Sequence, residues 1–395
     1  MAKSDATEHM LRAVDRLGPL IKEHAASAEA NRQLSSAVHE AMYQAGLFGM
    51  LVPKARGGFE LHPVETMRVW EAVARIDSAA AWNLIMNQAV ANFTAWLPAA
   101  GADEVYAGGI PTAAGAFHPL AKATRVDGGW RITGQVPFAS GCHHVKWLVM
   151  GAAEMEGDQP KVDPATGQPA PFAVFFPRNV VTIKDTWNTV GMRGTGSADV
   201  AVQDMVVPDR LTAPVAPLKN PAPGFEGLLI RLWPLHGILG EAIVSVGVAG
   251  AAVDEAVHLC KVKTPAYNAV PLREQQLAQY QIAKAKARVE ASRDTLYRAA
   301  EAAYEDVAAS GTSLSPEAKV RMQLAAAFAA EACAEAVRLV NDVAGASSIR
   351  LGNPFERHFR DLHVLMQHSD KSSPRYASAG RLMFGLENEW VWLSF

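Results

Sequence analysis

The chain has 395 residues, of which 49% are apolar and 19% are charged, and its formal net charge is −3. A chain of this length is too long for one ordinary core, so we expect two or three packed domains. The small net charge provides no basic field, which argues against nucleic acid or an anionic membrane as a partner.

The N-terminal string MAKSDATEHMLRAVDRLG has no apolar core with basic flanks, so it is not expected to be a signal peptide. No window approaches 18 uninterrupted apolar residues, so no transmembrane helix is expected. The cysteines Cys142, Cys260 and Cys333 are widely spaced and form no CxxC motif, which argues against disulfides or a zinc site. We therefore predict a cytoplasmic protein without a metal site.

Residues 1–112 are expected to form a helical domain. Apolar residues recur there at helical spacing, as in Leu11, Val14, Leu17 and Ile21. Asp77 is a suitable N-cap for the segment that follows, SAAAWNLIMNQAVANF. That segment is apolar on nearly all sides, so we expect it to be buried.

Residues 113–225 differ in character and predict a small β-domain. Asp127-Gly128 between two β-prone runs indicates a hairpin. The runs Trp147–Met150 and Phe172–Phe176 are typical of buried strands, and Val200–Pro208 closes the region as another strand. The polar, proline-rich string EGDQPKVDPATGQPAP predicts an exposed loop.

Residues 226–395 return to helical patterns. A long helix is expected from Pro271 to about Ala309, and Ser315 is expected to cap the next helix at Pro316. Long helices with short loops predict a four-helix bundle. The predicted fold class is therefore α+β: a helical domain, then a central β-barrel or sandwich, then a four-helix bundle.

This order resembles the acyl-CoA dehydrogenase superfamily. The string Phe138-Ala-Ser-Gly-Cys-His-His-Val-Lys-Trp147 is similar to the family's first flavin-contacting segment. The string Trp187-Asn-Thr-Val-Gly-Met-Arg-Gly-Thr-Gly-Ser-Ala-Asp-Val200 is similar to its second, and Arg357-His-Phe-Arg-Asp-Leu-His363 to its C-terminal Arg-Asp segment. The FASGCHH wording is closest to the two-component (group D) flavin monooxygenases, which hydroxylate phenols, indoles and related aromatics with reduced flavin.

The resemblance implies a site for reduced FMN or FAD. A flat isoalloxazine ring needs apolar walls and a few polar contacts at its N5 and O4 edge. Ser140 would contact that edge, Trp187 would cover a ring face, and the glycine turn would let backbone N–H groups approach flavin or phosphate. The alternative is an ordinary strand serine and a tight turn. The expected flavin-binding residues are Phe138, Ser140, Trp187, Arg193, Gly194, Thr195, Gly196, Ser197 and Arg273.

The resemblance also implies partners. No GxGxxG fingerprint opens a helix, so NAD(P)H is not expected to bind here, and a separate NAD(P)H-dependent flavin reductase is the implied partner. The segment Asn341–Ser347 matches the dehydrogenases' FAD-adenine segment only in part, so FMN and FAD both stay open. Arg273 resembles an arginine that reaches a neighbouring subunit's flavin, which requires an oligomer, and the family habit is a homotetramer. The apolar end Glu389–Phe395 supports such an interface.

Two candidate acid–base residues separate the functional hypotheses. A dehydrogenase needs a carboxylate base, but Met366–Tyr376 contains only one acid, Asp370. Glu241 on the first bundle helix is the remaining candidate for that base. His368 matches the C-terminal histidine of the monooxygenases, where it would move a proton while a flavin C4a-hydroperoxide formed with O2 transfers oxygen.

The first hypothesis is the oxygenase component of a two-component monooxygenase that hydroxylates an aromatic or heteroaromatic substrate, with His368 and Ser140 as catalytic residues. Its substrate is expected to contact His118, Trp82, Asn87 and Asn92. The second is an acyl-CoA dehydrogenase or related oxidase, which Glu241→Gln would inactivate selectively. The third is a non-catalytic homologue that binds a ligand but no flavin.

A metal site at Cys142, His143 and His144 is not expected, because adjacent strand residues point to opposite faces.

Overall fold

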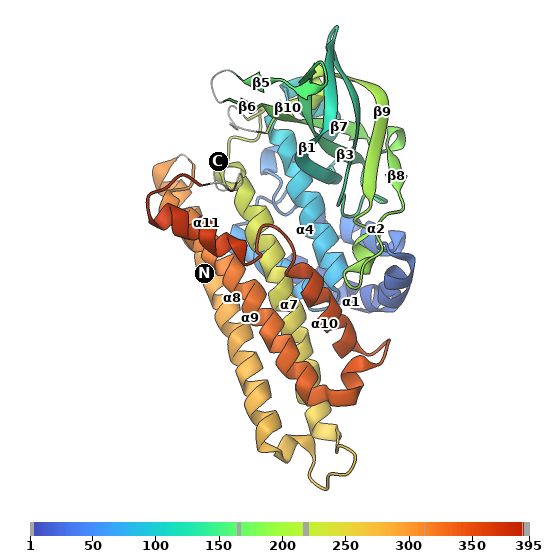
Figure 1. Ribbon diagram of the computed structural model, residues 1–395, viewed down its shortest axis with the longest axis vertical. Helices are drawn as coiled ribbons and strands as arrows, with labels where there is room; N and C mark the ends of the chain where they lie inside the picture. The colour runs from blue at the N-terminus through green and yellow to red at the C-terminus, as the bar shows by residue number, and fades with distance from the viewer. Residues whose placement is uncertain (1–3, 164–166, 216–220, 312, 389, 391–395) are drawn as a thin grey trace.

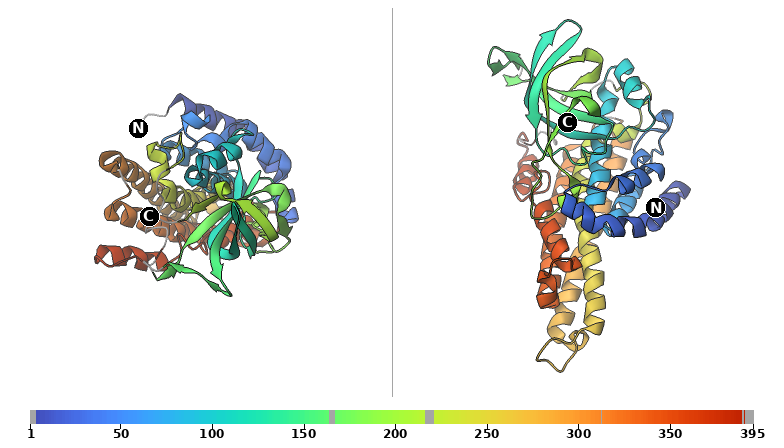
Figure 2. Two further views of the ribbon diagram at one scale, coloured as in Figure 1. Left: turned by 90° about the horizontal axis from the view of Figure 1, so that it is seen from above. Right: turned by 90° about the vertical axis from the view of Figure 1, so that its right-hand side faces the viewer.

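The computed structural model describes residues 4–163, 167–215, 221–311, 313–388 and 390. The apolar end predicted to lie in an interface falls, apart from residue 390, outside the described residues. Figure 1 shows the β-domain above the N-terminal helices, with a long helical bundle extending away from both. Figure 2 shows from a second side that the far end of this bundle projects alone.

The N-terminal part is helical. Its α-helices are α1 (Asp5–Asn31), α2 (Ser36–Gln44), α3 (Pro63–Ala74), α4 (Ser78–Asn92) and α5 (Ala99–Tyr106). Asp77 caps α4, because its side chain accepts a hydrogen bond from the Ala80 N–H at 2.8 Å. α4 is buried on nearly all sides, as its apolar composition predicted.

The β-domain is one mixed sheet with two small additions. Its strands are β1 (Ala113–Val126), β2 (Gly129–Val136), β3 (Trp147–Glu156), β7 (Pro171–Pro177), β8 (Thr182–Lys184), β9 (Asp199–Pro208) and β10 (Thr212–Pro214), in the order β10-β7-β3-β1-β2-β9-β8. The predicted hairpin forms, with Val126 paired to Gly129. The predicted loop after β3 instead contains short strands, β4 (Gln159–Pro160), β5 (Val162–Asp163) and β6 (Gln168–Pro169), because its ends pair locally.

The C-terminal part is helical again. It contains α6 (Leu228–Arg231), α7 (Trp233–Val262), α8 (Gln276–Ser310), α9 (Pro316–Ala344), α10 (Pro354–Leu365) and α11 (Pro374–Met383). Three long helices, α7 to α9, pack together, and the fourth member of the bundle is divided into α10 and α11. The interruption between α10 and α11 carries His368, so the break in the bundle positions the candidate acid–base residue.

Small residues let the N-terminal helices pack closely on α7. A Cβ at Gly240 would lie 2.8 Å from the Ile85 side chain, and one at Gly247 would lie 2.5 Å from the Ala74 Cβ. Residues 237–262 of α7 are long and apolar enough to cross a membrane, but 89% of their most apolar window is buried in protein. This stretch is therefore a core helix, around which the three parts assemble.

Candidate active site

Ser140 lies where the β-domain meets α4, in the segment between β2 and β3. The Trp82 indole N–H donates to the Ser140 hydroxyl at 3.0 Å, and this hydroxyl lies 2.7 Å from that of Ser197. The Asn87 amide donates to the Ser140 carbonyl at 2.9 Å. The sequence expectation that Asn87 contacts substrate is therefore corrected: its N–H group holds the backbone of Ser140.

The turn after Ser140 requires glycine. Gly141 has φ +73°, and a Cβ there would lie 2.9 Å from Asn87 Oδ1 and 3.0 Å from Asn83 Oδ1. Asn83 is completely buried, and neither of its amide atoms has a hydrogen-bond partner among the described residues. Sequence reasoning missed Asn83, although its spacing of four residues from Asn87 places both on one helix face.

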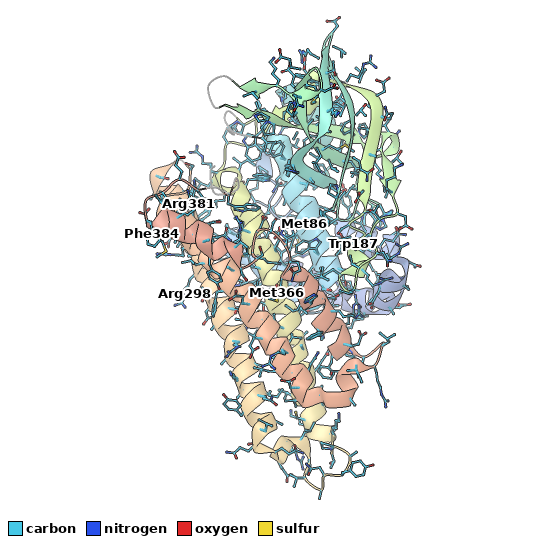
Figure 3. The ribbon with its side chains drawn as sticks, in the orientation of Figure 1. Met86, Trp187, Arg298, Met366, Arg381 and Phe384 are labelled. Carbon is cyan, nitrogen blue, oxygen red and sulfur yellow. The ribbon has the colours of Figure 1, made fainter. Side chains whose placement is uncertain are left out.

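Two aromatic rings flank the hydroxyl and fit the requirements of a flat cofactor ring. Phe138, at φ +63°, leaves 66% of its surface exposed and meets Trp187 edge-on at a centroid distance of 6.3 Å. The Trp187 N–H donates to the Met192 carbonyl at 3.1 Å, which fixes its ring at the β-domain edge seen in Figure 3. An open aromatic pair beside a fixed hydroxyl supplies the apolar wall and the polar edge that an isoalloxazine needs.

The glycine turn packs against protein. A Cβ at Gly194 would lie 3.0 Å from the Ala79 Cβ, and one at Gly196 would lie 3.1 Å from the His143 ring. Thr195 donates its hydroxyl to the Met192 carbonyl at 2.8 Å. We therefore correct the expected reason for these glycines: they let the turn pack closely on the helical part.

The two predicted phosphate-binding arginines lie apart from the hydroxyl and the rings. Arg193 donates to the Glu29 carbonyl at 3.2 Å and to the Thr189 carbonyl at 2.9 Å, so its guanidinium ties the turn to α1. Arg273 lies at the far end of the bundle and pairs with Glu274 at 3.4 Å. Within one chain neither arginine is brought to the candidate flavin pocket, and a contribution of Arg273 to a neighbouring subunit stays a prediction.

The other predicted substrate contacts are spread out. His118 is exposed on β1. Asn92 lies ten residues beyond Trp82 on α4, about 15 Å along the helix axis, and it borders a separate small cavity with Glu60 and Phe225. Met86 was missed, but it stays partly exposed one turn after Trp82, on the same face of α4 (Figure 3).

His368 and Glu241 meet. Nδ1 of His368 lies 2.6 Å from Oε2 of Glu241 on α7. His368 is half-buried, whereas Glu241 is only 2% exposed. The Trp82 ring packs edge-on against the His368 ring at a centroid distance of 5.3 Å. Trp82 therefore joins the two predicted catalytic residues, since it contacts both Ser140 and His368.

Two further ionisable side chains complete the cluster. An Asp370 carboxylate oxygen lies 4.0 Å from Nδ1 of His368. Lys371 is 1% exposed, donates to the main-chain carbonyl of Glu241 at 2.8 Å, and places its ammonium 5.0 Å from the centre of the Trp82 ring. Sequence reasoning missed Lys371, although it lies three residues after His368 in the same short segment.

Burial and charge shift the pKa values within the cluster. Burial acts to lower the pKa of His368, but the neighbouring charge of Glu241 outweighs it, so the pKa is raised. Burial, with repulsion from Glu241, raises the pKa of Asp370 to about 7. Burial lowers the pKa of Lys371 to about 8. These groups can therefore exchange protons near neutral pH.

The cluster also has the composition of a metal site. Ligand atoms of Glu241, His368 and Asp370 all lie within 4.8 Å of one another. The sequence analysis considered metals only around Cys142 and so missed this group. Lys371 already supplies a buried positive charge beside these acids. We therefore interpret the group as an ion-pair cluster.

Asp361 joins the three parts of the chain at this junction. Its carboxylate accepts from the Met192 N–H and from the Ser78 hydroxyl, both at 2.6 Å. Arg357, one turn earlier on α10, pairs with Asp77 at 2.6 Å. The Arg-Asp segment therefore anchors the loop after Trp187 and the start of α4 to the helix that leads into His368.

Family models match both helical parts. Residues 10–107 match the acyl-CoA dehydrogenase N-terminal domain, and residues 239–372 match the acyl-CoA dehydrogenase C-terminal domain. A pigment production hydroxylase of Rhodococcus sp. is 30% identical over 92% of this chain and 92% of its own length. An indole-3-acetate monooxygenase of Pseudomonas putida is 29% identical over 92% of this chain and 91% of its own.

Solved structures share the whole fold. XiaF from Streptomyces sp., determined with FADH2 and glycerol, superposes with a TM-score of 0.89 at 23% identity, over 97% of both chains. The 3-HSA hydroxylase from Rhodococcus sp. RHA1 has a TM-score of 0.87 at 23% identity, over 97% of this chain and 99% of its own. At this identity the two structures confirm the predicted architecture.

Proposed function

Since the chain belongs to the acyl-CoA dehydrogenase family, we propose that it is the oxygenase component of a two-component flavin-dependent monooxygenase. It uses reduced FAD or FMN and O2 to hydroxylate an aromatic or heteroaromatic substrate that resembles a phenol or an indole. The names of its relatives support this reaction class, since they are a hydroxylase and an indole-3-acetate monooxygenase that match over nine-tenths of the chain.

The contact between Glu241 and His368 carries the choice against a dehydrogenase. Abstraction of an α-proton needs a carboxylate that can reach the substrate directly. Glu241, the expected base, already has Oε2 2.6 Å from His368, and Asp370 is buried behind the same histidine with a pKa raised to about 7. Histidine is therefore the group that faces outward from this cluster.

The same contact corrects a test suggested by the sequence. Glu241→Gln was expected to inactivate only a dehydrogenase. Because Glu241 contacts His368, this substitution would impair a monooxygenase as well. The discriminating experiments must act on oxygen and on acyl-CoA chemistry directly.

The residues at the junction would hold and shield the flavin. Phe138 and Trp187 would provide the apolar wall, and Ser140, fixed by Trp82, would offer its hydroxyl to the polar edge of the ring. When bound, the reduced flavin supplies the electrons that activate O2. His368 would take up or donate the proton that moves during oxygen transfer to the substrate.

The partners follow from this reaction. A separate NAD(P)H-dependent reductase supplies the reduced flavin, and the enzyme works in the cytoplasm, where its three free, buried cysteines stay reduced. The chain assembles as a homotetramer. Apolar side chains exposed on the bundle support such an assembly, among them Val262, Leu277 and Tyr280.

The test is rapid mixing of the purified chain, loaded with anaerobically reduced FAD or FMN, with oxygenated buffer. We expect a long-lived absorbing species that is neither reduced nor oxidised flavin, and transfer of one 18O atom from O2 to indole-3-acetate or a simple phenol. Immediate reoxidation, as for free flavin, would contradict the monooxygenase. Bleaching of bound oxidised flavin by acyl-CoA thioesters would favour a dehydrogenase, and a failure to bind flavin in either redox state would favour the non-catalytic homologue.

A further inference from the structure

We propose that Glu241 is the positioning residue of His368: it holds the imidazole with the proton on Nδ1 and directs Nε2 toward the substrate. The role in turnover rests on the proposed monooxygenase function. The pairing itself is a property of the chain without flavin, and it can be tested separately.

The geometry assigns the carboxylate of Glu241 to His368. Oε2 of Glu241 lies 2.6 Å from Nδ1, which is the range of a charge-assisted hydrogen bond. Lys371 binds the main-chain carbonyl of Glu241 at 2.8 Å and therefore fixes the helix α7 backbone without occupying that carboxylate oxygen. The backbone of α7 and the segment that carries His368 are thus held at a fixed separation.

The tautomer follows from two competing contacts at Nδ1. The backbone N–H of Asp370 approaches Nδ1 at 3.5 Å, which would require Nδ1 to accept. The Glu241 carboxylate, a full negative charge at 2.6 Å, requires Nδ1 to donate. The shorter, charged contact is the stronger by a wide margin, so the proton resides on Nδ1. Nε2 then carries the lone pair and serves as the base.

The burial of Glu241 also calls for a role. A carboxylate that is 2% exposed costs several kcal/mol of desolvation unless it is paired. Its side chain could serve packing alone, as an anchor between α7 and the segment after α10. Packing alone would leave the basicity of His368 unchanged when Glu241 becomes the isosteric glutamine, whereas a positioning role would not.

Other groups around His368 define what glutamine would leave behind. Asp370 lies 4.0 Å from Nδ1, and Lys371 lies next to it in the chain. From α4, Trp82 contributes an uncharged ring edge; from α9, Gln323 binds the Asp370 carbonyl at 2.7 Å, and the Cys333 thiol, whose pKa burial raises to about 12, stays neutral. Without Glu241, burial and Lys371 would act on His368 against Asp370 alone.

The experiment measures the ionisation of each histidine in the full-length chain without added flavin. Exchange of the imidazole C2–H with deuterium, followed by peptide mass spectrometry from pH 4 to 10, gives a separate pKa for His368. We expect Glu241→Gln to lower this pKa by about 1–3 pH units, the effect of removing an adjacent opposite charge. Glu241→Asp should restore part of the difference, because it keeps the charge on a shorter side chain.

Glu255→Gln is the matched control. Glu255 lies on the same helix α7 and contacts another histidine, His358, at 3.1 Å, so the substitution removes an equivalent carboxylate away from the site. It should leave the His368 pKa unchanged. An unchanged His368 pKa in Glu241→Gln would overturn the proposal. Should that variant not fold, a wild-type pKa for His368 in Glu241→Asp would do the same.

The pH dependence of product formation provides the second measurement. A less basic His368 loses its proton at lower pH, so the acid limb of the profile should move to lower pH in Glu241→Gln, while its plateau falls by roughly 10²–10⁴-fold. A lower plateau with an unshifted limb would contradict positioning and leave a packing role. A shifted His368 pKa in a chain that oxygenates nothing would instead count against the monooxygenase and keep the pairing.

Discussion

The indole N–H of Trp82 donates to the Ser140 hydroxyl at 3.0 Å, while the same ring packs edge-on against His368. Trp82 belongs to α4, Ser140 to the β-domain and His368 to the C-terminal helices. One side chain therefore sets the spacing between the hydroxyl proposed to meet the flavin edge and the imidazole proposed to move the proton.

Trp82→Phe should keep the ring contact with His368 and remove the hydrogen bond to Ser140. We expect unfolding to become easier by about 1 kcal/mol and the yield of product per reduced flavin to fall. Trp70→Phe is the control, because it removes the buried bond from Trp70 to Gln88 away from the site. It should lower the unfolding free energy while the product yield stays at the wild-type level; equal yields in both variants would contradict the role of Trp82.

His368→Asn should abolish proton transfer without removing a cofactor contact. We expect product formation to fall by roughly 10²–10⁴-fold while the affinity for reduced flavin stays within a factor of about two. The measurement is 18O incorporation beside a flavin titration. His363→Asn, an exposed position on the same helix α10, should behave as wild type. Full activity in His368→Asn would remove this residue from the mechanism.

Phe138→Ala should weaken flavin binding, because it removes one of the two aromatic walls. An aromatic contact contributes about 0.5–1.5 kcal/mol, so the Kd for reduced flavin should rise by about 2- to 10-fold. Anaerobic fluorescence titration measures it. Val206→Ala, an exposed apolar position on β9, should leave the Kd unchanged. An unaltered Kd in Phe138→Ala would place the flavin elsewhere.

Asp370→Asn should change how stability depends on pH. Burial raises the pKa of Asp370 to about 7, so between about pH 4 and pH 7 the folded chain binds a proton that the unfolded chain has lost. This group therefore makes the wild type less stable as the pH rises through that window. The asparagine variant should lack this component in urea unfolding at several pH values. Asp158→Asn, at an exposed position, should retain the wild-type slope, and a wild-type slope in Asp370→Asn would argue against the shifted pKa.

Much of the fold could be read from local patterns. The apolar residues on every side of α4 predicted a buried helix, and Asp127-Gly128 predicted the β1–β2 hairpin. The resemblance of the segments around Ser140 and Trp187 predicted the family. Such features depend on neighbours in the chain, and therefore on periodicity and turn chemistry that a sequence displays directly.

The roles of individual polar residues were harder to predict. Asn87 and Arg193 were expected to contact ligands, yet they hold the backbone of Ser140 and α1. The glycine turn was expected to admit a ligand, yet its α-carbons pack against α4 and His143. A hydrogen-bonding side chain looks the same in sequence whether its partner is a ligand or a distant backbone group.

The sequence by itself determined the order of helical and β parts, the buried central helices and the family, since these follow from hydrophobic periodicity and from contiguous strings of residues. Only the tertiary structure decided that Glu241 and His368, proposed as acid–base residues of rival mechanisms, are partners 2.6 Å apart. Proximity across the fold and the loss of water around a buried carboxylate set that pairing and its pKa values, and neither quantity is encoded in any local pattern.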